Sequence, residues 1–446
     1  MTSPRIAPAD LLAQKIAGRS ARVGVIGLGY VGLPLAVTAA RAGFPVTGFD
    51  IDTTKADRLD RGKSYIEAVS DADLVAVQER FDWTGDFARL ADMDVIIICV
   101  PTPLTRQREP DLSFVEATAR VIAAHMSPGT LVALESTTWP GTTREVLTPI
   151  LQSGGLEHGV EFFTGFSPER EDPGNTSYRT KTIPKIVAGD GELAGAMMEA
   201  FYGAVVDAVV RVPDTATAEA VKITENIFRS VNIALVNELK LIYDAMGIDV
   251  WEVVRGAATK PFGYMPFYPG PGLGGHCIPI DPFYLTWRAR EFEVPTRFIE
   301  LAGEINTAMP RHVVDRLREV LDRASGRGLN GARILLVGVA YKKNVSDMRE
   351  SPSMRLMQLL EEAGAAVEFL DPHVPEVPPM REYGQFRARR AIAPEALADA
   401  GFDAVLIATD HDAVDYGALI QLGCPVVDTR NAIAARGLPM GRVTKA

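Results

Sequence analysis

A glycine-rich segment near the amino terminus constrains the fold of this chain more than any other feature. The apolar run Arg22–Gly27 is a predicted strand, and Val31–Ala42 is a predicted helix. The three glycines of the segment, Gly27, Gly29 and Gly32, lie where the strand ends and the helix begins. Glycine allows the tight turn at the first position, close approach of a ligand at the second, and packing of helix on strand at the third. In this context the G-x-G-x-x-G spacing is typical of a strand–turn–helix unit that binds a dinucleotide pyrophosphate.

Asp50 ends the next predicted strand, Pro45–Asp50, about 20 residues further on. Its carboxylate can accept from both ribose hydroxyls and repels a 2′-phosphate, which favours NAD over NADP as the cofactor. Asp52, just beyond the strand end, is the alternative group for reading the ribose. The predicted NAD site comprises Gly27, Leu28, Gly29, Tyr30, Val31 and Asp50.

Strands and amphipathic stretches continue to alternate over residues 22–150, with predicted strands at Asp94–Val100 and Thr130–Glu135. Strand signals at 161–164 and 185–188 extend the same sheet. This alternation predicts a parallel sheet with right-handed crossovers.

A long helical run follows, from Thr215 to Met246, and Gly247 ends it. After a polar stretch at 325–332 the strand–helix alternation restarts and predicts a second, smaller parallel sheet. We therefore expect an α/β protein in which two Rossmann-like parallel-sheet domains are joined by a long central helix and a helical middle domain. The expected bounds are 1–212 for the NAD-binding domain, 213–324 for the central domain and 325–446 for the C-terminal domain.

The overall composition excludes several classes of protein. A formal net charge of −11 argues against binding to nucleic acid or a membrane surface, so an anionic substrate needs a local basic cluster. No segment has the pattern of a signal peptide or a membrane span, and three cysteines make no disulfide framework, which predicts a cytoplasmic protein. Cys99 and Cys424 lie in apolar, strand-like runs and are expected to be inert core thiols. No metal site is predicted.

Cys277 lies in a loop of glycines and prolines, Gly270–Pro282, where a packing role is harder to defend. Glycines let a bulky ligand approach the sulfur, and Asp281 supplies a carboxylate four residues on. A nucleophilic thiol downstream of an NAD domain suggests oxidation of an aldehyde through a thioester. An inert thiol in a structural loop is the alternative, and an incidental role is expected for the adjacent His276.

Lys222 and Asn226 lie four residues apart on the long predicted helix and project from one face. Lys222 has apolar neighbours, so its ammonium is expected to be partly removed from water. A solvated helix charge is the other interpretation of this lysine.

Several motifs in order resemble the UDP-glucose/GDP-mannose dehydrogenase family over about residues 20 to 440: GVIGLGYVGLPLA, ICVPTPL, ESTTWPGTT, SPEREDPG, AEAVKITENIFRSVNIALVNELK, GPGLGGHCIPIDPFYLTW and GVAYKKNVSDMRESPS. The resemblance implies a four-electron oxidation of a UDP-sugar with two NAD per turnover, a C-terminal domain that binds UDP, and a homodimer built around the long central helix.

The resemblance also assigns roles. Cys277 looks like the nucleophile, Lys222 like the residue that stabilises the developing oxyanion, and Asn226 like its hydrogen-bonding partner. Asp281 resembles the carboxylate that handles protons with Lys222 and a water. The remaining catalytic residues implied are Glu169, for thioester hydrolysis, and Thr137, which orients the water network.

Further binding residues follow from the same resemblance. Lys342 looks like the phosphate-binding lysine of the UDP site, Arg430 is a further expected UDP contact, and Arg349 resembles a residue that reaches the NAD site. Additional NAD contacts are expected at Pro101, Thr102 and Thr137. The expected substrate contacts also include Glu169, Arg170, Lys222, Asn226, Gly274 and the aromatic residues Tyr264, Phe267 and Tyr268.

The GGHCIPID and SPEREDPG segments depart from the glucose-specific pattern and resemble the branch that oxidises UDP-N-acetylhexosamines. The IPIDPFYLTW segment favours UDP-N-acetylglucosamine, whose uronic acid would supply surface polysaccharide biosynthesis. UDP-glucose and UDP-N-acetylmannosamine remain alternative substrates. A non-catalytic nucleotide-sugar-binding protein and a two-electron 3-hydroxyacid dehydrogenase are the alternatives from other classes.

Overall fold

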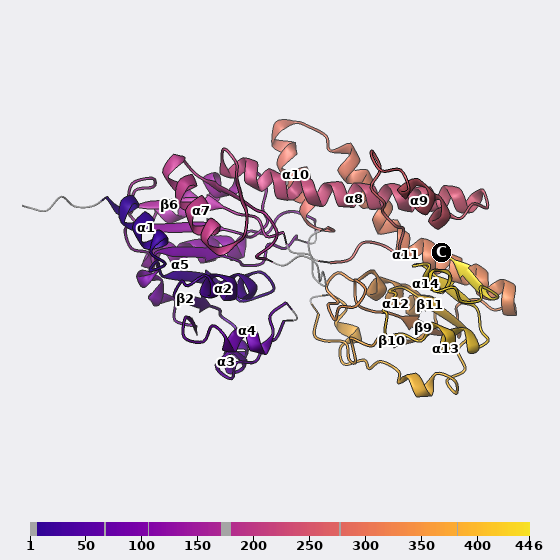
Figure 1. Cartoon of the computed structure of the whole chain (residues 1–446). Helices are drawn as coiled ribbons and strands as arrows, with labels where there is room; N and C mark the ends of the chain where they lie inside the picture. Colours follow the sequence, from indigo (N-terminus) through magenta and orange to yellow (C-terminus); the bar gives the residue numbers. More distant parts are fainter. Residues whose placement is uncertain (1–6, 67, 106, 171–179, 276–277, 381) are drawn as a thin grey trace, which may run out of the picture. The chain divides into compact units, whose positions relative to one another are not determined.

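The computed structural model describes residues 7–66, 68–105, 107–170, 180–275, 278–380 and 382–446. It divides into two compact units, each built around its own β-sheet (Figure 1). Unit 1 comprises residues 1–225 and 283–294, and unit 2 comprises residues 226–282 and 295–446.

The sheet of unit 1 has the strand order β3-β2-β1-β4-β5-β6-β7-β8. Its strands are β1 (Val23–Ile26), β2 (Val46–Phe49), β3 (Phe81–Thr84), β4 (Val95–Ile98), β5 (Thr130–Leu134), β6 (Phe162–Phe166), β7 (Lys185–Gly189) and β8 (Val209–Arg211). All neighbours from β3 to β6 are parallel, so the carboxyl ends of these strands meet at one edge. The strand order reverses between β1 and β4, the place where open α/β sheets bind their ligands.

Helix α1 (Pro8–Ala17) precedes β1, and the helices between the strands are α2 (Gly32–Arg41), α3 (Thr53–Asp60), α4 (Asp71–Val75), α5 (Ser113–His125), α6 (Thr148–Gln152) and α7 (Glu192–Val205). A short π-helix at Thr143–Leu147 leads into α6. The long helix α8 (Thr215–Ala245) ends within one residue of its predicted end, and the boundary between the two units falls inside it.

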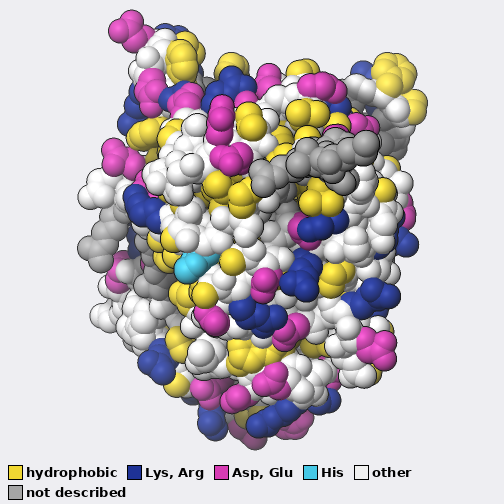
Figure 2. Space-filling view, turned by 90° about the vertical axis from the view of Figure 1, so that its left-hand side faces the viewer, with side chains coloured by type: hydrophobic (Ala, Val, Ile, Leu, Met, Phe, Trp, Pro, Cys, Tyr) yellow, Lys and Arg dark blue, Asp and Glu magenta, His cyan; other side chains and the backbone are white. Residues whose placement is uncertain are grey.

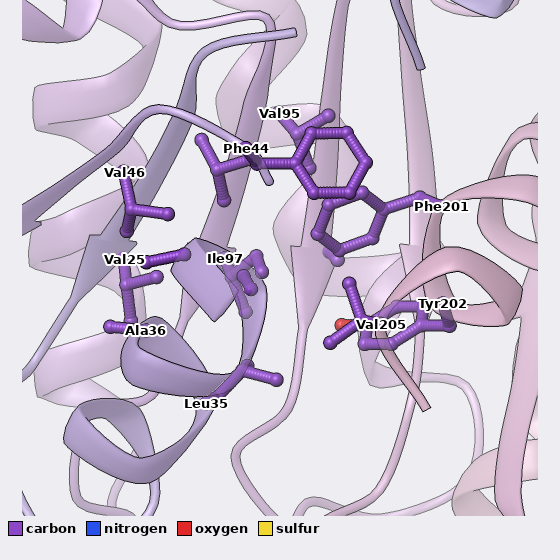
Figure 3. Packing of buried hydrophobic residues seen from close by; sticks show 14 of the residues in the cluster. Val25, Leu35, Ala36, Phe44, Val46, Val95, Ile97, Phe201, Tyr202 and Val205 are labelled. Atoms are coloured by element: carbon purple, nitrogen blue, oxygen red, sulfur yellow. The ribbon is translucent and has the colours of Figure 1, made fainter. Parts of the chain in front are cut away.

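One hydrophobic core of unit 1 lies between the sheet and helices α2 and α7 (Figure 3). Val25 and Ile97 contribute from strands at the centre of the sheet, and Leu35 contributes from α2. The rings of Phe44 and Phe201 pack with their centroids 5.4 Å apart, which joins the start of β2 to α7. All five side chains are fully buried, and this packing fixes the glycine-rich turn between β1 and α2.

Unit 2 contains the helices α9 (Val250–Ala258) and α11 (Arg297–Ser325), the part of α8 from Asn226 onward and the start of α10 (Asp281–Ala289). Its sheet is parallel throughout and has the order β10-β9-β11-β12-β13. The strands are β9 (Arg333–Val337), β10 (Ala366–Leu370), β11 (Ala404–Ile407), β12 (Val426–Asp428) and β13 (Val443–Lys445), and the helices between them are α12 (Pro352–Glu362), α13 (Tyr416–Gln421) and α14 (Ala432–Ala435).

The structure confirms the predicted α/β class with two parallel-stranded sheets, and it differs from the sequence prediction in one respect. Strand β7 runs antiparallel to β6, with Phe166 opposite Ala188 and Gly165 opposite Gly189. The apolar pattern of a buried strand is the same in both directions, so the sequence contained no signal for this reversal. The two thiols expected in the core, Cys99 after β4 and Cys424 before β12, are partly buried and pack against hydrophobic core clusters, as predicted.

No helix in the described part of the chain is both long and apolar enough to cross a bilayer. Among the described residues, no group of three or more His, Cys, Asp or Glu side chains could hold a metal ion. On the face shown in Figure 2, basic and acidic side chains are interspersed, without a broad patch of one sign.

Candidate active site

The glycine-rich turn joins β1 to α2. A Cβ at Gly27, where φ is +92°, would lie 2.6 Å from the carbonyl oxygen of Cys99, and one at Gly32 would lie 1.9 Å from that of Gly27. At Gly29 an added Cβ would meet nothing within 4 Å, so a ligand can approach the backbone there. Helix α2 begins without a side-chain N-cap, and the partial positive charge of its amino end suits a phosphate. The turn therefore fits the pyrophosphate of NAD.

Asp50 lies beside this turn at the end of β2 and is 8% exposed. Its Oδ2 accepts from the backbone N–H of Leu28 at 2.9 Å and from Lys55 Nζ at 2.7 Å. Its Oδ1 accepts from the N–H of Asp52 at 2.9 Å. Asp52 itself caps α3 through Thr54, and those hydrogen bonds lower its pKa. Asp50 is therefore the carboxylate at the turn. It is paired with the Lys55 ammonium, a contact that was not predicted from the sequence.

The loops after β4 and β5 meet at the carboxyl edge of the sheet. Ser136 Oγ donates to the carbonyl oxygen of Val100 at 2.7 Å, and the next residue, Thr137, is half-buried. Thr102 is 6% exposed, and its carbonyl oxygen accepts from the hydroxyl of Tyr284 at 3.0 Å. This hydrogen bond joins α10 to the loop that carries two of the predicted NAD contacts, Pro101 and Thr102. Of the other predicted NAD contacts, Tyr30 and Pro101 are exposed and Val31 is half-buried.

The best-defined group of predicted catalytic residues is carried by α8 and α10. Asn226 Nδ2 donates to Asp281 Oδ2 at 2.6 Å, and these residues are 6% and 3% exposed. Lys222 lies one turn earlier on α8 and is 8% exposed. No hydrogen bond or ion pair joins Lys222 to another described residue. A buried ammonium is costly without a partner, so this lysine is suited to receive an oxygen from a ligand.

Glu169 and Arg170 follow β6 at the same edge of the sheet. Glu169 Oε2 lies 3.1 Å from Lys185 Nζ, and Glu169 Oε1 accepts from the N–H of Arg170 at 2.7 Å. Lys185 also donates to Glu135 Oε2 at 2.8 Å. The guanidinium of Arg170 pairs with Glu225 on α8 at 2.6 Å. Glu169 is therefore held in a charged network and is not an isolated surface carboxylate.

The proposed nucleophile Cys277 and its neighbour His276 lie outside the described residues, and their predicted roles remain predictions. The preceding glycines are described. A Cβ at Gly274 would lie 2.7 Å from Cβ of Tyr341, and the N–H of Gly275 donates to the carbonyl oxygen of Arg349 at 3.3 Å. Only glycine allows the loop to approach this segment of unit 2 so closely.

The predicted UDP contacts lie in unit 2. Arg430, just after β12, donates from Nε to the carbonyl oxygen of Ala408 at 2.8 Å. A Cβ at Gly270 would lie 2.4 Å from Arg430 Nη1, so the cysteine-bearing loop passes directly over this guanidinium. Burial lowers the pKa of Arg430. Lys342 is half-buried after β9, and Arg349 forms an ion pair with Asp347 at 2.7 Å.

The aromatic residues of the predicted sugar and uridine pocket divide between packing and exposure. Tyr268 stacks on Trp251 with ring centroids 5.5 Å apart, and Phe267 packs against Phe228 at 5.7 Å. Tyr264 is 41% exposed. Phe267 and Tyr268 therefore have packing partners within unit 2, while much of Tyr264 faces solvent.

Three residues in the neighbourhood of the predicted site were not predicted from the sequence: Lys55 beside Asp50, Lys185 beside Glu169, and Glu219 on α8. Glu219 is fully buried and accepts from the N–H groups of Gly141 and Thr143. For Lys185 and Glu219 the available signal was a charged residue at an otherwise apolar position of a predicted strand or helix, whereas Lys55 lies in a polar helix and gave no such signal. Such residues are rarely buried unless they are paired, but their partners are distant in sequence.

Comparison with known proteins shows matches along most of the chain. Models of the UDP-glucose/GDP-mannose dehydrogenase family match at residues 21–206 (NAD binding domain), 216–308 (central domain) and 335–435 (UDP binding domain). A UDP-N-acetyl-D-glucosamine 6-dehydrogenase from Pseudomonas aeruginosa is 34% identical over 87% of this chain and 90% of its own. A UDP-N-acetyl-D-mannosamine dehydrogenase from Pyrococcus horikoshii is 35% identical over 87% of this chain and 89% of its own.

Solved structures show the same similarity. A UDP-D-ManNAc dehydrogenase structure from Pyrococcus horikoshii has a TM-score of 0.85 and 33% identity, covering 95% of this chain and 98% of that one.

Proposed function

Because this chain belongs to the UDP-glucose/GDP-mannose dehydrogenase family of NAD-dependent enzymes, we propose that it oxidises the C6 hydroxyl of UDP-N-acetylglucosamine to a carboxylate. The observation that carries the proposal is the buried group on α8 and α10. There, Asn226 holds Asp281, and Lys222, one turn away, has no partner among the described residues.

The first oxidation converts the C6 alcohol to an aldehyde. The turn between β1 and α2 would hold NAD, which would supply the hydride acceptor for both oxidations. Asp281, with a water, takes the proton of the substrate hydroxyl, and Asn226 fixes the orientation of that carboxylate. Lys222 stabilises the oxygen as negative charge develops on it, and the low exposure of this lysine strengthens the interaction.

The second oxidation proceeds through Cys277. Its thiolate adds to the aldehyde carbon, Lys222 stabilises the resulting oxyanion, and loss of a second hydride leaves a thioester. A water then attacks the thioester carbonyl, Glu169 accepts a proton from that water, and the Cys277 thiolate leaves. Thr137 orients the water. The products are a uronic acid and the regenerated enzyme, with two NADH formed for each sugar.

The substrate assignment rests on two segments. GGHCIPIDPFYLTW and SPEREDPG follow the pattern of the N-acetylhexosamine branch. An acetamido group offers one donor, one acceptor and a methyl group, and a site with partners for them leaves those partners unpaired when UDP-glucose binds. The roles of Arg170, Gly274, Tyr264, Phe267 and Tyr268 as substrate contacts belong to this proposal.

The decisive experiment compares kcat/KM for UDP-N-acetylglucosamine, UDP-N-acetylmannosamine and UDP-glucose with NAD. We expect UDP-N-acetylglucosamine to be preferred over UDP-glucose by at least about fivefold, since one unmatched buried polar group costs about 1–3 kcal/mol. Equal or better turnover of UDP-glucose would reject the branch assignment, and preference for the manno epimer would reject the assignment at C2.

The proposal includes a homodimer formed along α8. Phe228, Leu235 and Ile242 are 49%, 51% and 47% exposed and recur every seven residues, which places them on one side of the helix. A stripe of large exposed apolar side chains is typical of a covered interface.

The three-domain division at 212/213 and 324/325 is part of the same proposal. So is a cytoplasmic role in supplying a uronic acid for surface polysaccharide, which three cysteines in 446 residues favour over an oxidising compartment.

A further inference from the structure

A buried ionic cluster lies at the carboxyl edge of the unit 1 sheet, and the mechanism above uses only one of its members. Lys185 Nζ lies 2.8 Å from Glu135 Oε2 and 3.1 Å from Glu169 Oε2. The hydroxyl of Tyr202 on α7 lies 2.5 Å from Glu135 Oε1. The side chains of Glu135 and Lys185 are 0% and 4% exposed, and that of Glu169 is 13% exposed.

The antiparallel direction of β7 explains how these residues come together. Phe166 is opposite Ala188, and continuing this register past the end of β6 places Glu169 opposite Lys185. Ser167 Oγ donates to the carbonyl oxygen of Ile186 at 2.9 Å, which extends the pairing in that direction. In a parallel β7, Lys185 would begin the strand at the opposite edge of the sheet, away from Glu169. The reversal therefore brings a buried cation to the edge where Glu169 lies.

The charges of the cluster do not cancel. With Lys185 charged and both carboxyl groups ionised, one net negative charge would be removed from water, which is costly. Burial raises the pKa of Glu135, and that carboxyl is the less exposed of the two. The negative charge of the cluster is therefore held more readily on Glu169, the more exposed of the two carboxyl groups, than on Glu135.

The other ionisable groups around the cluster are consistent with this distribution. Burial raises the pKa of Tyr202 and of Cys99 well above their usual values, so both groups stay neutral. Burial opposes the charge on Lys185, but Glu135 and Glu169 outweigh it and raise its pKa. On the other side of Glu169, the charge of Arg170 is paired with Glu225. Among the residues that the structure describes, Lys185 is thus a buried cation that bonds directly to the Glu169 carboxylate.

We propose that Lys185 is a positioning residue for thioester hydrolysis, which keeps the Glu169 carboxylate ionised and in place while Glu135 holds the lysine and Tyr202 holds Glu135. The inference rests on the proposed role of Glu169 as the base of that step. Removing the Lys185 cation, whose Nζ lies 3.1 Å from Glu169 Oε2, disfavours the ionised form of Glu169. The acidic limb of the pH–rate profile, in which the hydrolysis rate falls as the pH falls, should therefore move to higher pH.

The test uses the full-length enzyme with NAD and the UDP-sugar that it turns over fastest. Both hydride transfers precede hydrolysis, so a pre-steady-state burst of two NADH per site reports them, and the slower steady state reports hydrolysis. For Lys185→Met we expect an unchanged burst and a steady-state rate that is lower on the acidic limb, by a factor of about ten for each pH unit by which the limb is displaced, and that recovers as the pH rises. Lys185→Arg should keep the acidic limb near its wild-type position.

Glu135→Gln is the matched variant, because glutamine keeps the shape of glutamate and removes its charge. It should leave the acidic limb in place even if the rate is lower. The double variant Glu135→Gln/Lys185→Met avoids an unpaired buried charge, so it serves if Lys185→Met does not fold, and it should show the raised limb. An unmoved limb in both Lys185→Met and the double variant, or a loss of rate equal at all pH values, would overturn the inference.

Glu169→Gln separates this inference from the proposed function. If Glu169→Gln abolishes the limb while Lys185→Met leaves it in place, only the role of Lys185 is wrong. If Glu169→Gln hydrolyses the thioester like the wild type, the proposed base is wrong, and the inference fails with it.

Discussion

We expect the free energy needed to open the ESTTWPGTT loop away from Glu219 on α8 to fall as the pH rises. The carboxyl is fully buried and accepts from the N–H of Gly141 at 2.5 Å, from the N–H of Thr143 at 2.8 Å and from Thr143 Oγ1 at 2.6 Å. Burial outweighs these three donors and raises the pKa of Glu219 from 4.5 to about 7. The folded protein therefore retains a proton that the opened loop releases between these two pH values.

The sign and magnitude follow by linkage. A carboxyl whose pKa is raised on folding stabilises the folded state fully below pH 4.5, and this contribution is lost as the pH rises through about 7. The difference between the two pKa values corresponds to about 3 kcal/mol, at about 1.4 kcal/mol per pH unit. Glu219→Gln has no proton to lose, so its opening free energy should lack this fall.

Hydrogen exchange of the backbone amides in residues 143–152, corrected for the intrinsic pH dependence, measures the opening free energy of this segment. From pH 4.5 to pH 8, the wild type should lose up to about 3 kcal/mol relative to Glu219→Gln. The control variant Glu79→Gln, an exposed carboxylate in the same unit, should behave as the wild type. A wild-type segment that becomes no less stable than Glu219→Gln with rising pH would mean that the three donors outweigh burial, and the reasoning would be refuted.

Three further predictions concern the nucleophile, the cofactor and the dimer. Cys277→Ser should abolish acid formation and leave NAD binding intact, because a serine alkoxide is scarce at neutral pH; wild-type turnover would rule out covalent catalysis through this residue. Asp50→Ala should raise the NADP/NAD ratio of kcat/KM, since it removes a repelling charge and leaves Lys55 to meet a 2′-phosphate. Asp50→Ala/Lys55→Ala should lose much of that gain, whereas an unchanged ratio in Asp50→Ala would mean that another group reads the ribose. Leu235→Glu should halve the molar mass measured by sedimentation, while Leu193→Glu, an equally exposed apolar position on α7, should not; a dimer that survives Leu235→Glu would place the interface elsewhere.

Local patterns were sufficient for much of the fold. The glycine motif located the turn between β1 and α2, and helical periodicity with Gly247 located α8 to within one residue of its end. These features can be predicted because they depend on residues close together in the sequence, through backbone conformation and the periodicity of one buried face. The same holds for the Lys222 and Asn226 pair, whose spacing on a helix fixes their common face.

The remaining features depend on contacts between distant residues. The apolar pattern of β7 does not indicate the direction of the strand. That direction nevertheless places Lys185 beside Glu169. The partners of Glu219 lie 76 and 78 residues away, and Lys55 is a surface-type residue in a helix. The Asn226–Asp281 hydrogen bond was anticipated only as two separate roles, because nothing in the sequence measures the distance between two helices.

The yield of NADH from a limiting amount of UDP-N-acetylglucosamine tests the central claim most directly. With excess NAD, the proposed mechanism predicts two NADH per sugar consumed and a product that carries a carboxylate at C6. The second NADH requires the aldehyde to be captured and oxidised before release, which is the step assigned to Cys277 and Lys222. A yield of one NADH, with a two-electron product, would contradict four-electron oxidation.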